Sequence, residues 1–198
     1  MVTGSDLGER LRRLAPGSAV ALRLDAASYA DHYLLAINAT VRDVGIETNA
    51  HSIYVSVTNP AALVWTIAQA LDVPQERLDF VDAISHIMMD YRNPLPNASY
   101  LESPRMLENI MLRVEYLLRR TPGQRHIVVI DSVNSLAIHN SSKLLSEFFH
   151  ILISNLKARQ VLTVLLSVRE ESSTFIDQLL SLVVDETIDL KGEGVEPA

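Results

Sequence analysis

The 198-residue chain contains no cysteine, so disulfides, thiol nucleophiles and cysteine-ligated metal sites are excluded. Glycine is scarce as well: only seven are present, and none lies in residues 24–38, LDAASYADHYLLAIN. This stretch joins a strand-like apolar run to an amphipathic helical segment. In many α/β proteins such a junction holds a glycine-rich loop whose backbone N–H groups bind phosphate. The missing glycines leave open what this junction does instead.

Long hydrophobic runs and an excess of positive charge are also missing. No run approaches the roughly 20 apolar residues that span a bilayer, and the charged N-terminal segment lacks the apolar core of a signal peptide. We therefore expect a cytoplasmic protein with no membrane partner. The 17 Lys and Arg residues are outnumbered by 24 Asp and Glu, which gives a formal net charge of −7. Because DNA affinity depends largely on basic patches, a nucleic-acid partner is disfavoured.

What remains is the composition of a globular domain, with 48% apolar and 21% charged residues. The length fits one domain, and no internal repeat or low-complexity segment interrupts it. We expect a single domain over residues 1–198, with an N-terminal helical segment at 1–16 and a flexible tail at 191–198.

Short apolar runs alternate with longer segments of helical period. Strands are predicted at residues 19–24, 52–57, 78–84, 126–131, 161–168 and 183–190. Helices are predicted at residues 6–14, 30–44, 61–71 and 174–182, in one segment begun by an N-cap at Ser103-Pro104, and in another capped within residues 140–142. Residues 85–102 are predicted to be a loop. This alternation predicts an α/β fold, a three-layer α-β-α sandwich with a mostly parallel sheet.

Asp131 is the clearest candidate for a functional residue. In open α/β sheets ligands bind beyond the carboxyl ends of the strands, and the run HIVVID, residues 126–131, ends in this acid and is followed by Ser132. Many nucleoside triphosphatases hold a hydrated magnesium ion on an acid in this position. The alternative is that Asp131 only caps the turn that follows.

Other catalytic patterns are not found. None of the six histidines forms an i, i+4 pair or a His-Glu-x-x-His sequence, the patterns of a zinc site. His86 and Asp90 are four residues apart, but they lie in the proline-containing loop. No Gly-x-Ser-x-Gly sequence marks a hydrolase nucleophile, and Ser132 has no base visible in the sequence. Neither a metal site nor a catalytic triad is predicted.

Read in order, four segments resemble the KaiC-like branch of the RecA superfamily, which is common in archaea. FVDAIS (80–85) resembles its third core strand, and HIVVIDSVNSL (126–136) its Walker B strand with the following Asp-Ser. LLSEFFHILISNLKARQVLTVLLSV (144–168) is similar to its next helix and strand, and LLSLVVDETIDL (179–190) to its closing segment. The resemblance covers residues 17–190 and implies the RecA-like fold of the P-loop NTPase superfamily.

The same resemblance places DAASYADH, residues 25–32, where the family has its phosphate loop. Asp31 then occupies the position of the lysine, and His32 that of the hydroxyl that binds magnesium. The nearest lysine in the chain is Lys143. A carboxylate about 4 Å from a phosphate charge is repelled by about 4 kcal/mol at an effective dielectric constant near 20. The resemblance therefore implies a degenerate Walker A motif and no functional P-loop.

Two further departures agree with this interpretation. After the strand at 52–57 the family carries paired glutamates that activate water, whereas this chain has Thr58 and Asn59 and no visible general base. Active relatives continue into a hairpin whose basic residues reach the neighbouring subunit's nucleotide, and the sequence stops at Ala198, after the segment leading into that hairpin. We therefore expect a pseudo-ATPase with no cofactor.

Three functional hypotheses follow. The leading one is a catalytically inactive regulatory or scaffolding module, whose partner is a second copy or an active KaiC-like relative, with Asp131 and Ser132 vestigial. The second is a nucleotide or small-ligand sensor with weak ATP and magnesium binding, in which Tyr29 stacks on a base and His32 contacts phosphate. The third is a divergent ATPase with a metal ion among four carboxylates, those of Asp25, Asp31, Asp82 and Asp131.

Overall fold

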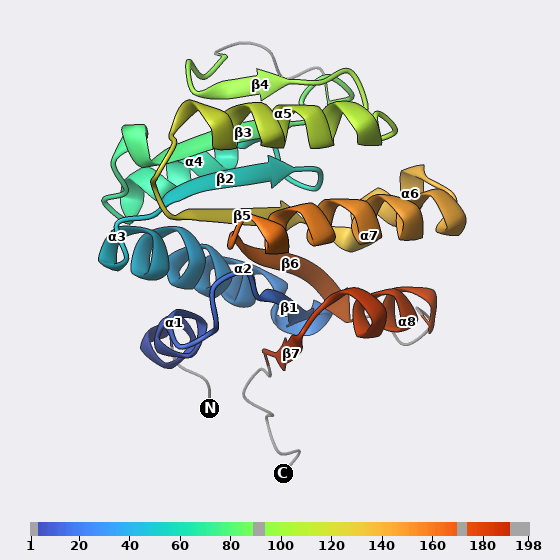
Figure 1. The fold of residues 1–198 in the computed structure, drawn as a ribbon, viewed down its shortest axis with the longest axis horizontal. Coiled ribbons are helices and arrows are strands. Elements are labelled where there is room, and N and C mark those ends of the chain that lie inside the picture. Colours follow the sequence, from blue (N-terminus) through green and yellow to red (C-terminus); the bar gives the residue numbers. More distant parts are fainter. Residues whose placement is uncertain (1–3, 89–93, 170–173, 191–198) are drawn as a thin grey trace.

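The computed structural model of the chain describes residues 4–88, 94–169 and 174–190. A seven-stranded sheet runs through the molecule with the strand order β4-β3-β2-β5-β6-β1-β7, and all neighbouring strands are parallel (Figure 1). The strands are β1 (Ala19–Asp25), β2 (His51–Ser56), β3 (Leu78–Asp82), β4 (Ala98–Tyr100), β5 (His126–Asp131), β6 (Leu162–Arg169) and β7 (Glu186–Asp189). The predicted three-layer α/β fold is thus confirmed.

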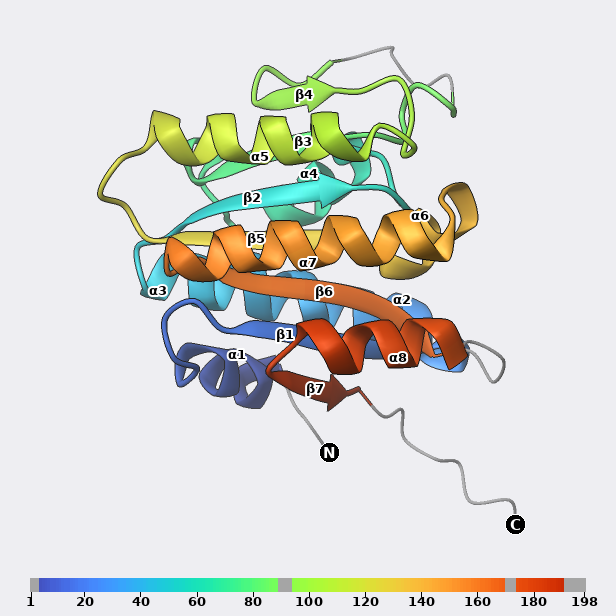
Figure 2. The same cartoon turned by 45° about the vertical axis from the view of Figure 1, so that its right-hand side comes forward.

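Helices cover both faces of this sheet (Figures 1 and 2). One layer contains α1 (Gly4–Arg12), the 3-10 turn η1 (Ala26–Ser28), α2 (Tyr29–Ile37), the π-helix η2 (Asn38–Val44), α3 (Gly45–Glu47) and α4 (Ala61–Ala70). The other contains α5 (Leu107–Arg120), α6 (Val133–His139), α7 (Ser142–Ala158) and α8 (Thr174–Val183). A further 3-10 turn, η3 (Gln75–Arg77), leads into β3.

Two hydrophobic cores lie on opposite sides of the sheet because successive side chains of a strand point to opposite faces. In β2, Ile53 and Val55 join the core beneath α5 and α7, whereas Tyr54 joins the core beneath α1, α2 and α4. The predicted apolar face of α7, including Phe149 and Leu152, is fully buried in the first core. Each such side chain contributes about 1.5–3 kcal/mol by leaving water.

Three local predictions are wrong. The predicted loop 85–102 contains β4, a short strand whose partly buried side chains carry no apolar pattern and which pairs only with β3. Ser103 is not the N-cap of α5: the helix begins at Leu107 after Met106, and Ser103 Oγ accepts the Arg105 N–H in the preceding turn. The predicted last strand begins late, because α8 continues through residue 183 and β7 starts at residue 186.

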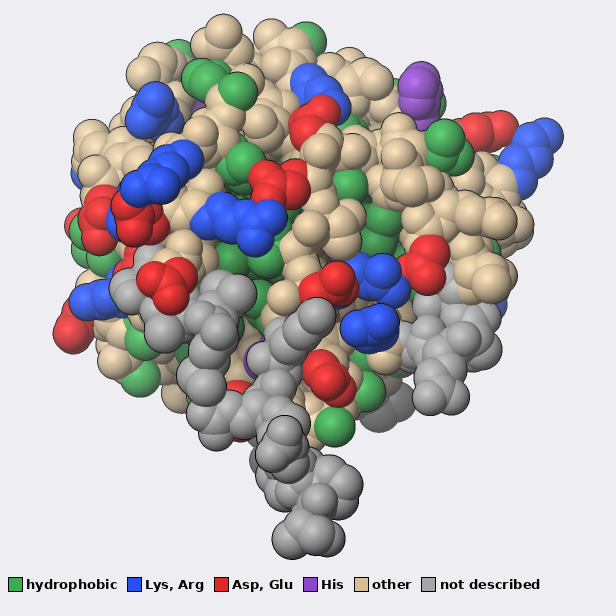
Figure 3. Space-filling model, turned by 90° about the horizontal axis from the view of Figure 1, so that it is seen from below, with side chains coloured by type: hydrophobic (Ala, Val, Ile, Leu, Met, Phe, Trp, Pro, Cys, Tyr) green, Lys and Arg blue, Asp and Glu red, His purple; other side chains and the backbone are tan. Residues whose placement is uncertain are grey.

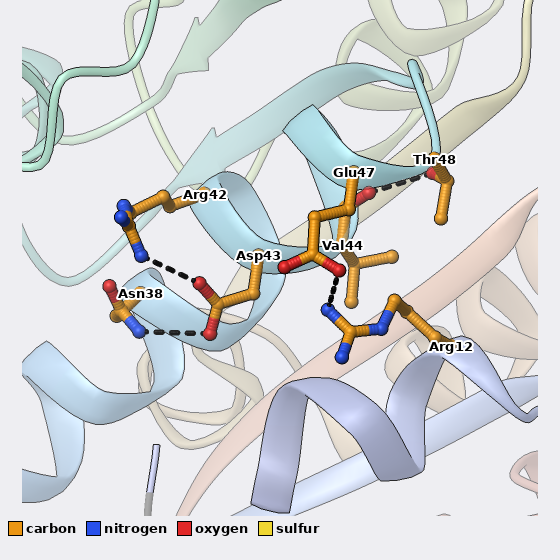
Figure 4. Close-up of polar contacts among 7 residues, drawn as sticks. All are labelled: Arg12, Asn38, Arg42, Asp43, Val44, Glu47 and Thr48. Atoms are coloured by element: carbon orange, nitrogen blue, oxygen red, sulfur yellow. Dashed lines mark hydrogen bonds and ion pairs between the residues drawn. The ribbon is translucent and has the colours of Figure 1, made fainter. Parts of the chain in front are cut away.

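The helix predicted over 30–44 exists but changes its hydrogen bonding after Ile37, where η2 replaces the α-helical pattern. Thr40 Oγ1 donates to the Ala36 carbonyl at 2.6 Å within this region. Helix α1 packs directly on η2, with Gly8 against Asp43, and the Arg12 guanidinium of α1 pairs with Glu47 (Figure 4). The N-terminal helix is therefore fixed to the long helical segment beside it.

The sheet edge at β7 carries charges of both signs. Arg23 of β1 pairs with Asp177 at 2.7 Å and lies 3.7 Å from Asp189, and Arg10 pairs with Glu186. The view of this side in Figure 3 shows basic and acidic side chains interspersed. Charged side chains of this kind discourage an edge strand from pairing with another chain. No helix within the described ranges is long and apolar enough to cross a membrane.

Candidate functional site at the carboxyl edge of the sheet

The junction between β1 and α2 is closed by its own side chains. Asp25 ends β1, only the three residues of η1 follow, and α2 begins at Tyr29. The Asp25 carboxylate accepts the Ala27 N–H at 2.9 Å, so it takes one of the backbone donors of this turn. A phosphate loop needs a longer glycine-rich connection that leaves several N–H groups free. This junction has three residues between β1 and α2 and contains no glycine.

The two residues at the expected lysine and hydroxyl positions lie on different sides of α2. Asp31 is exposed in the first turn of the helix, where a carboxylate interacts favourably with the helix dipole. His32 is buried, and its Nδ1 accepts the backbone N–H of Asp25 at 3.0 Å. Since Nδ1 is engaged within the protein, His32 fixes the end of β1 to α2.

Asp131 lies at the end of β5, in the middle of the sheet, and its side chain is almost completely buried. The Tyr33 hydroxyl donates to Asp131 Oδ2 at 2.6 Å, and the Tyr54 hydroxyl donates to the same oxygen at 3.0 Å. The two hydroxyl oxygens are 3.0 Å apart. Tyr33 comes from α2 and Tyr54 from β2, so side chains from two elements meet on one carboxylate oxygen.

The electrostatics of this group follow from its burial. Desolvation raises the pKa of the Asp131 carboxyl above its ordinary value, while hydrogen bonds from Tyr33 and Tyr54 act in the opposite direction. Burial, with the nearby Asp131 charge, raises the pKa of both tyrosines far above the ordinary value. Both hydroxyls therefore keep their protons and act as donors toward the acid.

A third tyrosine extends this layer. The ring of Tyr29 stacks on Tyr33 with centroids 5.5 Å apart and an interplanar angle of 19°. Its hydroxyl accepts a hydrogen bond from Asn59 Nδ2 at 3.3 Å, and burial raises its pKa. The aromatic layer connects the start of α2 to the segment after β2. The sequence signal for it is the i, i+4 spacing of Tyr29 and Tyr33, which places both rings on one face of a helix.

Beside Asp131 lies a cluster of three hydroxyl groups. Thr58 Oγ1 lies 3.0 Å from Ser132 Oγ and 2.7 Å from Ser135 Oγ, and Ser132 Oγ accepts the Ser135 N–H at 3.3 Å. Ser132, and not Asp131, is therefore the cap of the following helix, so the capping role considered for Asp131 is wrong. That helix, α6, begins at Val133 and was not predicted. Thr58, which stands where the resemblance places one of the family's paired glutamates, is bonded to these two serines.

Asp82, at the end of β3, is fully buried and accepts four hydrogen bonds. Its Oδ2 accepts from the Ala61 N–H at 2.8 Å and from Ser85 Oγ at 2.6 Å, and its Oδ1 from the N–H groups of Ile84 and Ser85 at 3.0 and 2.8 Å. This carboxylate caps the start of α4 from another element, so its lone pairs are used structurally.

The four carboxylates considered for a metal ion do not form one site. Within the described part of the chain, no three His, Cys, Asp or Glu side chains converge in a group that could hold a metal ion. Asp131 is bonded to tyrosines, Asp82 to backbone donors and Asp25 to its own turn, while Asp31 faces solvent. Asp90, four residues from His86 in the sequence, lies outside the described residues.

Comparison with known proteins identifies the fold. No protein-family model and no curated protein sequence matches the chain. Among solved structures, the KaiC-like protein PH0186 from the hyperthermophilic archaeon Pyrococcus horikoshii OT3 is similar with a TM-score of 0.56 and 14% identity, over 91% of this chain and 75% of that one. A second solved structure, described as an ATPase domain, is similar with a TM-score of 0.61 and 13% identity, over 90% and 71% of the two chains.

A third similar structure is the uncharacterized protein PH0321 from Pyrococcus horikoshii, described in complex with an unknown peptide. It has a TM-score of 0.68 and 12% identity, over 98% of this chain and 87% of that one. At these identities the likeness concerns the fold alone. The chain therefore has a RecA-like α/β fold, which is the fold that the sequence resemblance predicted.

Proposed function

We propose that this KaiC-like, RecA-fold domain does not hydrolyse ATP and acts as a regulatory or scaffolding protein-interaction module. The observation that carries the proposal is the pair of tyrosine hydroxyls on Asp131 Oδ2. In a working site of this fold the strand-end acid faces magnesium-bound water. Here Tyr33 and Tyr54 occupy that oxygen, and both are themselves buried in the protein core.

A magnesium-bound water that approaches Oδ2 of Asp131 would have to displace these donors. A hydrogen bond to a charged group is worth about 1.5–3 kcal/mol, and leaving a buried hydroxyl without a partner costs a further 1–3 kcal/mol, roughly. Tyr33 and Tyr54 donate to the same oxygen of Asp131, so a ligand that takes this oxygen breaks both hydrogen bonds and the free-energy cost is incurred for each hydroxyl. The tight β1–α2 junction and the exposed charge of Asp31 oppose a triphosphate at the neighbouring position.

Apolar side chains exposed around the same edge support the interaction role. The carboxyl edge is the right-hand side of Figure 1, where α2, α4, α6 and α7 approach it. Five large side chains in these helices and in the segment after β3 are between 47% and 80% exposed, those of Leu34, Leu63, Met88, Ile138 and Leu144. They belong to helices of both layers, and large exposed apolar groups are available to a protein partner. The peptide present in the PH0321 structure is consistent with binding of polypeptide by this fold.

The sensor hypothesis has weaker support. Tyr29 would stack on a base in that hypothesis, but its ring already stacks on Tyr33 and its hydroxyl is bonded to Asn59. His32 would contact phosphate, but its Nδ1 accepts the N–H of Asp25. Both groups would have to give up contacts within the protein before they could bind a ligand.

Isothermal titration calorimetry with ATP and magnesium tests the catalytic part of the proposal. We expect no heat of binding and no rise in melting temperature at millimolar nucleotide. The Tyr33→Phe/Tyr54→Phe double variant removes both hydroxyls and is the matched control, because it reveals whether they alone block the site. Binding of ATP by the wild-type chain in the micromolar range would overturn the proposal.

Light scattering over a range of protein concentrations tests the interaction part, with a second copy or an active KaiC-like protein as partner. Ile138→Glu should weaken association at least about tenfold by placing a charge in the interface. Leu182→Glu is the control, because Leu182 is 82% exposed against 80% for Ile138 but lies near the opposite end of the strands. Equal effects of the two changes, or a wild-type chain that binds neither partner, would count against this part.

A further inference from the structure

Two adjoining hollows lie at the amino edge of the sheet, opposite the candidate site. The smaller has a volume of about 100 Å³ and the larger about 410 Å³. Both are lined by Pro16, Arg125, His126 and Gln160, so they form one continuous depression. It lies where α1 turns into β1 and where β5 and β6 begin. None of its lining residues takes part in the interactions around Asp131.

The charge of this depression is opposite to that of the chain. Its charged lining residues are Arg12, Arg125 and Arg159, and no aspartate or glutamate is among the described residues that line it. The sequence as a whole carries a net charge of −7. A depression whose charged lining residues are all arginines attracts anions, although Arg125 and Arg159 are exposed to solvent.

The arginines differ in whether they are already paired. Arg12 pairs with Glu47 (Figure 4), and Arg159 lies 3.9 Å from Glu115. Within the described residues, the Arg125 guanidinium makes no hydrogen bond or ion pair. Arg125 is therefore the cation that an incoming anion meets without first displacing a carboxylate of the protein.

His126 adds hydrogen bonding to this site and little charge. Its Nε2 lies 2.6 Å from Thr121 Oγ1, and burial, with the nearby His51, lowers the pKa of its imidazole. The ring is therefore neutral at physiological pH. Recognition of a negatively charged ligand at this site therefore depends on Arg125.

The smaller hollow has a different character, because most of its wall is aliphatic. Leu14, Val44, Ile127 and Leu162 are among its lining residues. Its volume of about 100 Å³ leaves room for a small aliphatic group, which would contact these side chains next to the polar residues Thr48 and Gln160.

We propose that this depression binds an acidic peptide segment of a partner protein, with one aliphatic side chain in the smaller hollow and a neighbouring carboxylate on Arg125. The larger hollow, which Arg159 and Gln124 also line, accommodates the backbone and a second acidic side chain. Guanidinium–carboxylate contacts can be bidentate, so they orient a peptide as well as attract it. The inference rests on the proposed role in protein interaction and adds a second recognition surface to it.

Nuclear magnetic resonance of the ¹⁵N-labelled full chain tests the site with three short peptides. The probe is acetyl-Ala-Leu-Asp-Glu-Ala-amide, and its analogues replace Asp-Glu by Asn-Gln or Leu by Gly. We expect the probe to shift the backbone amides of Ala50, Ile127 and Leu162, with binding that weakens as salt is added. Each analogue should bind at least about fivefold more weakly, since each loses one of the two anchors.

Arg125→Gln should weaken the probe at least about tenfold, the expected loss for one charge-assisted contact. Arg113→Gln is the matched control, because it removes the same charge from an exposed position on α5 outside both hollows. Equal affinity for the acidic and the amide peptide, equal effects of the two variants, or no shifts at the amino edge at millimolar peptide would overturn the inference. If the peptides do not bind and the chain does not bind ATP, the inference is wrong but the proposed function stands. If the chain binds ATP, the proposed function is wrong irrespective of the peptide result.

Discussion

The hydroxyl of Tyr33 lies 2.6 Å from Oδ2 of Asp131, although the two residues are 98 positions apart in the chain. This hydrogen bond joins the first half of the sequence to the last residue of the central strand β5. It also explains how an acid with no ion pair in the described structure is held in the protein interior. The neighbouring Tyr54 hydroxyl completes the arrangement at 3.0 Å from the same oxygen.

Tyr33→Phe removes the shorter of these hydrogen bonds and leaves the ring in place. We expect the free energy of unfolding to fall by about 1.5–3 kcal/mol, because the buried carboxylate loses a donor. Urea denaturation followed by circular dichroism measures this loss. Tyr116→Phe is the control, since Tyr116 is 53% exposed and should change stability by less than about 0.5 kcal/mol. Equal losses in the two variants would contradict the role assigned to Tyr33.

The raised pKa of Asp131 predicts how stability changes with pH. A carboxyl whose pKa is higher in the folded than in the unfolded protein binds a proton more tightly when folded. Its protonation therefore favours folding, fully below the ordinary value of 3.8 and progressively less as pH rises through the folded-state pKa. We expect the wild-type chain to gain stability relative to Asp131→Asn as pH is lowered through the folded-state pKa of Asp131 toward 3.8.

Denaturation of the wild type and of Asp131→Asn at each pH measures this difference in the free energy of unfolding. The contributions of the other carboxyl groups largely cancel in the difference, because these groups titrate in both proteins. A difference that is constant with pH, or that moves against the wild type in acid, would show that burial does not control the ionisation of Asp131.

Asp82→Ala should be among the most destabilising single changes in the chain. The change removes the carboxylate that accepts four hydrogen bonds. The N–H groups of Ala61, Ile84 and Ser85, and the Ser85 hydroxyl, would lose this acceptor. A loss of about 3–5 kcal/mol is expected, as for other buried carboxylates that satisfy several donors. Asp31→Ala, at an exposed position, should cost less than about 1 kcal/mol. Thermal denaturation of the two variants compares them, and similar melting temperatures would refute this ranking.

Gly8→Ala tests the contact between α1 and the π-helix. A Cβ at this position would lie 2.9 Å from both Cβ and Oδ2 of Asp43, and that side chain is held by Asn38 and Arg42 (Figure 4). Alanine improves helix propensity by about 1 kcal/mol, but overpacking costs about 1–3 kcal/mol. We expect net destabilisation and faster amide hydrogen exchange in α1. Glu9→Ala, one position away on the exposed side, should leave exchange in this helix slow.

The central strands were predictable because each is an apolar run of the right length that ends at a polar residue. Asp131 was found in this way, since the end of a strand such as HIVVID can be located from neighbouring residues alone. Its partners could not be found, because the helical period assigns Tyr33 to the core without saying what its hydroxyl meets. Tyr54 stands within a strand and gave no separate signal.

Features decided by distant neighbours were missed for the same reason. β4 has only three residues, and it is a strand because β3 lies beside it. Helix α6 has seven residues, which are too few for a helical period of apolar residues to be recognised in the sequence. Its N-cap, Ser132, directly follows Asp131, and the sequence pattern there indicated a functional acid and not a helix start. The role of Asp82 depends on Ala61, which belongs to the preceding helix.

The position of β1 has a consequence for synthesis of the chain. β1 lies between β6 and β7, and its register pairs Ala19 with Thr163 and Val20 with Glu186. β1 is therefore synthesised before both of the strands with which it pairs. At roughly 5–20 residues per second, the intervening chain takes on the order of ten seconds to make. For that time an apolar strand has both edges unpaired, and production of this protein should therefore depend strongly on chaperones and on temperature.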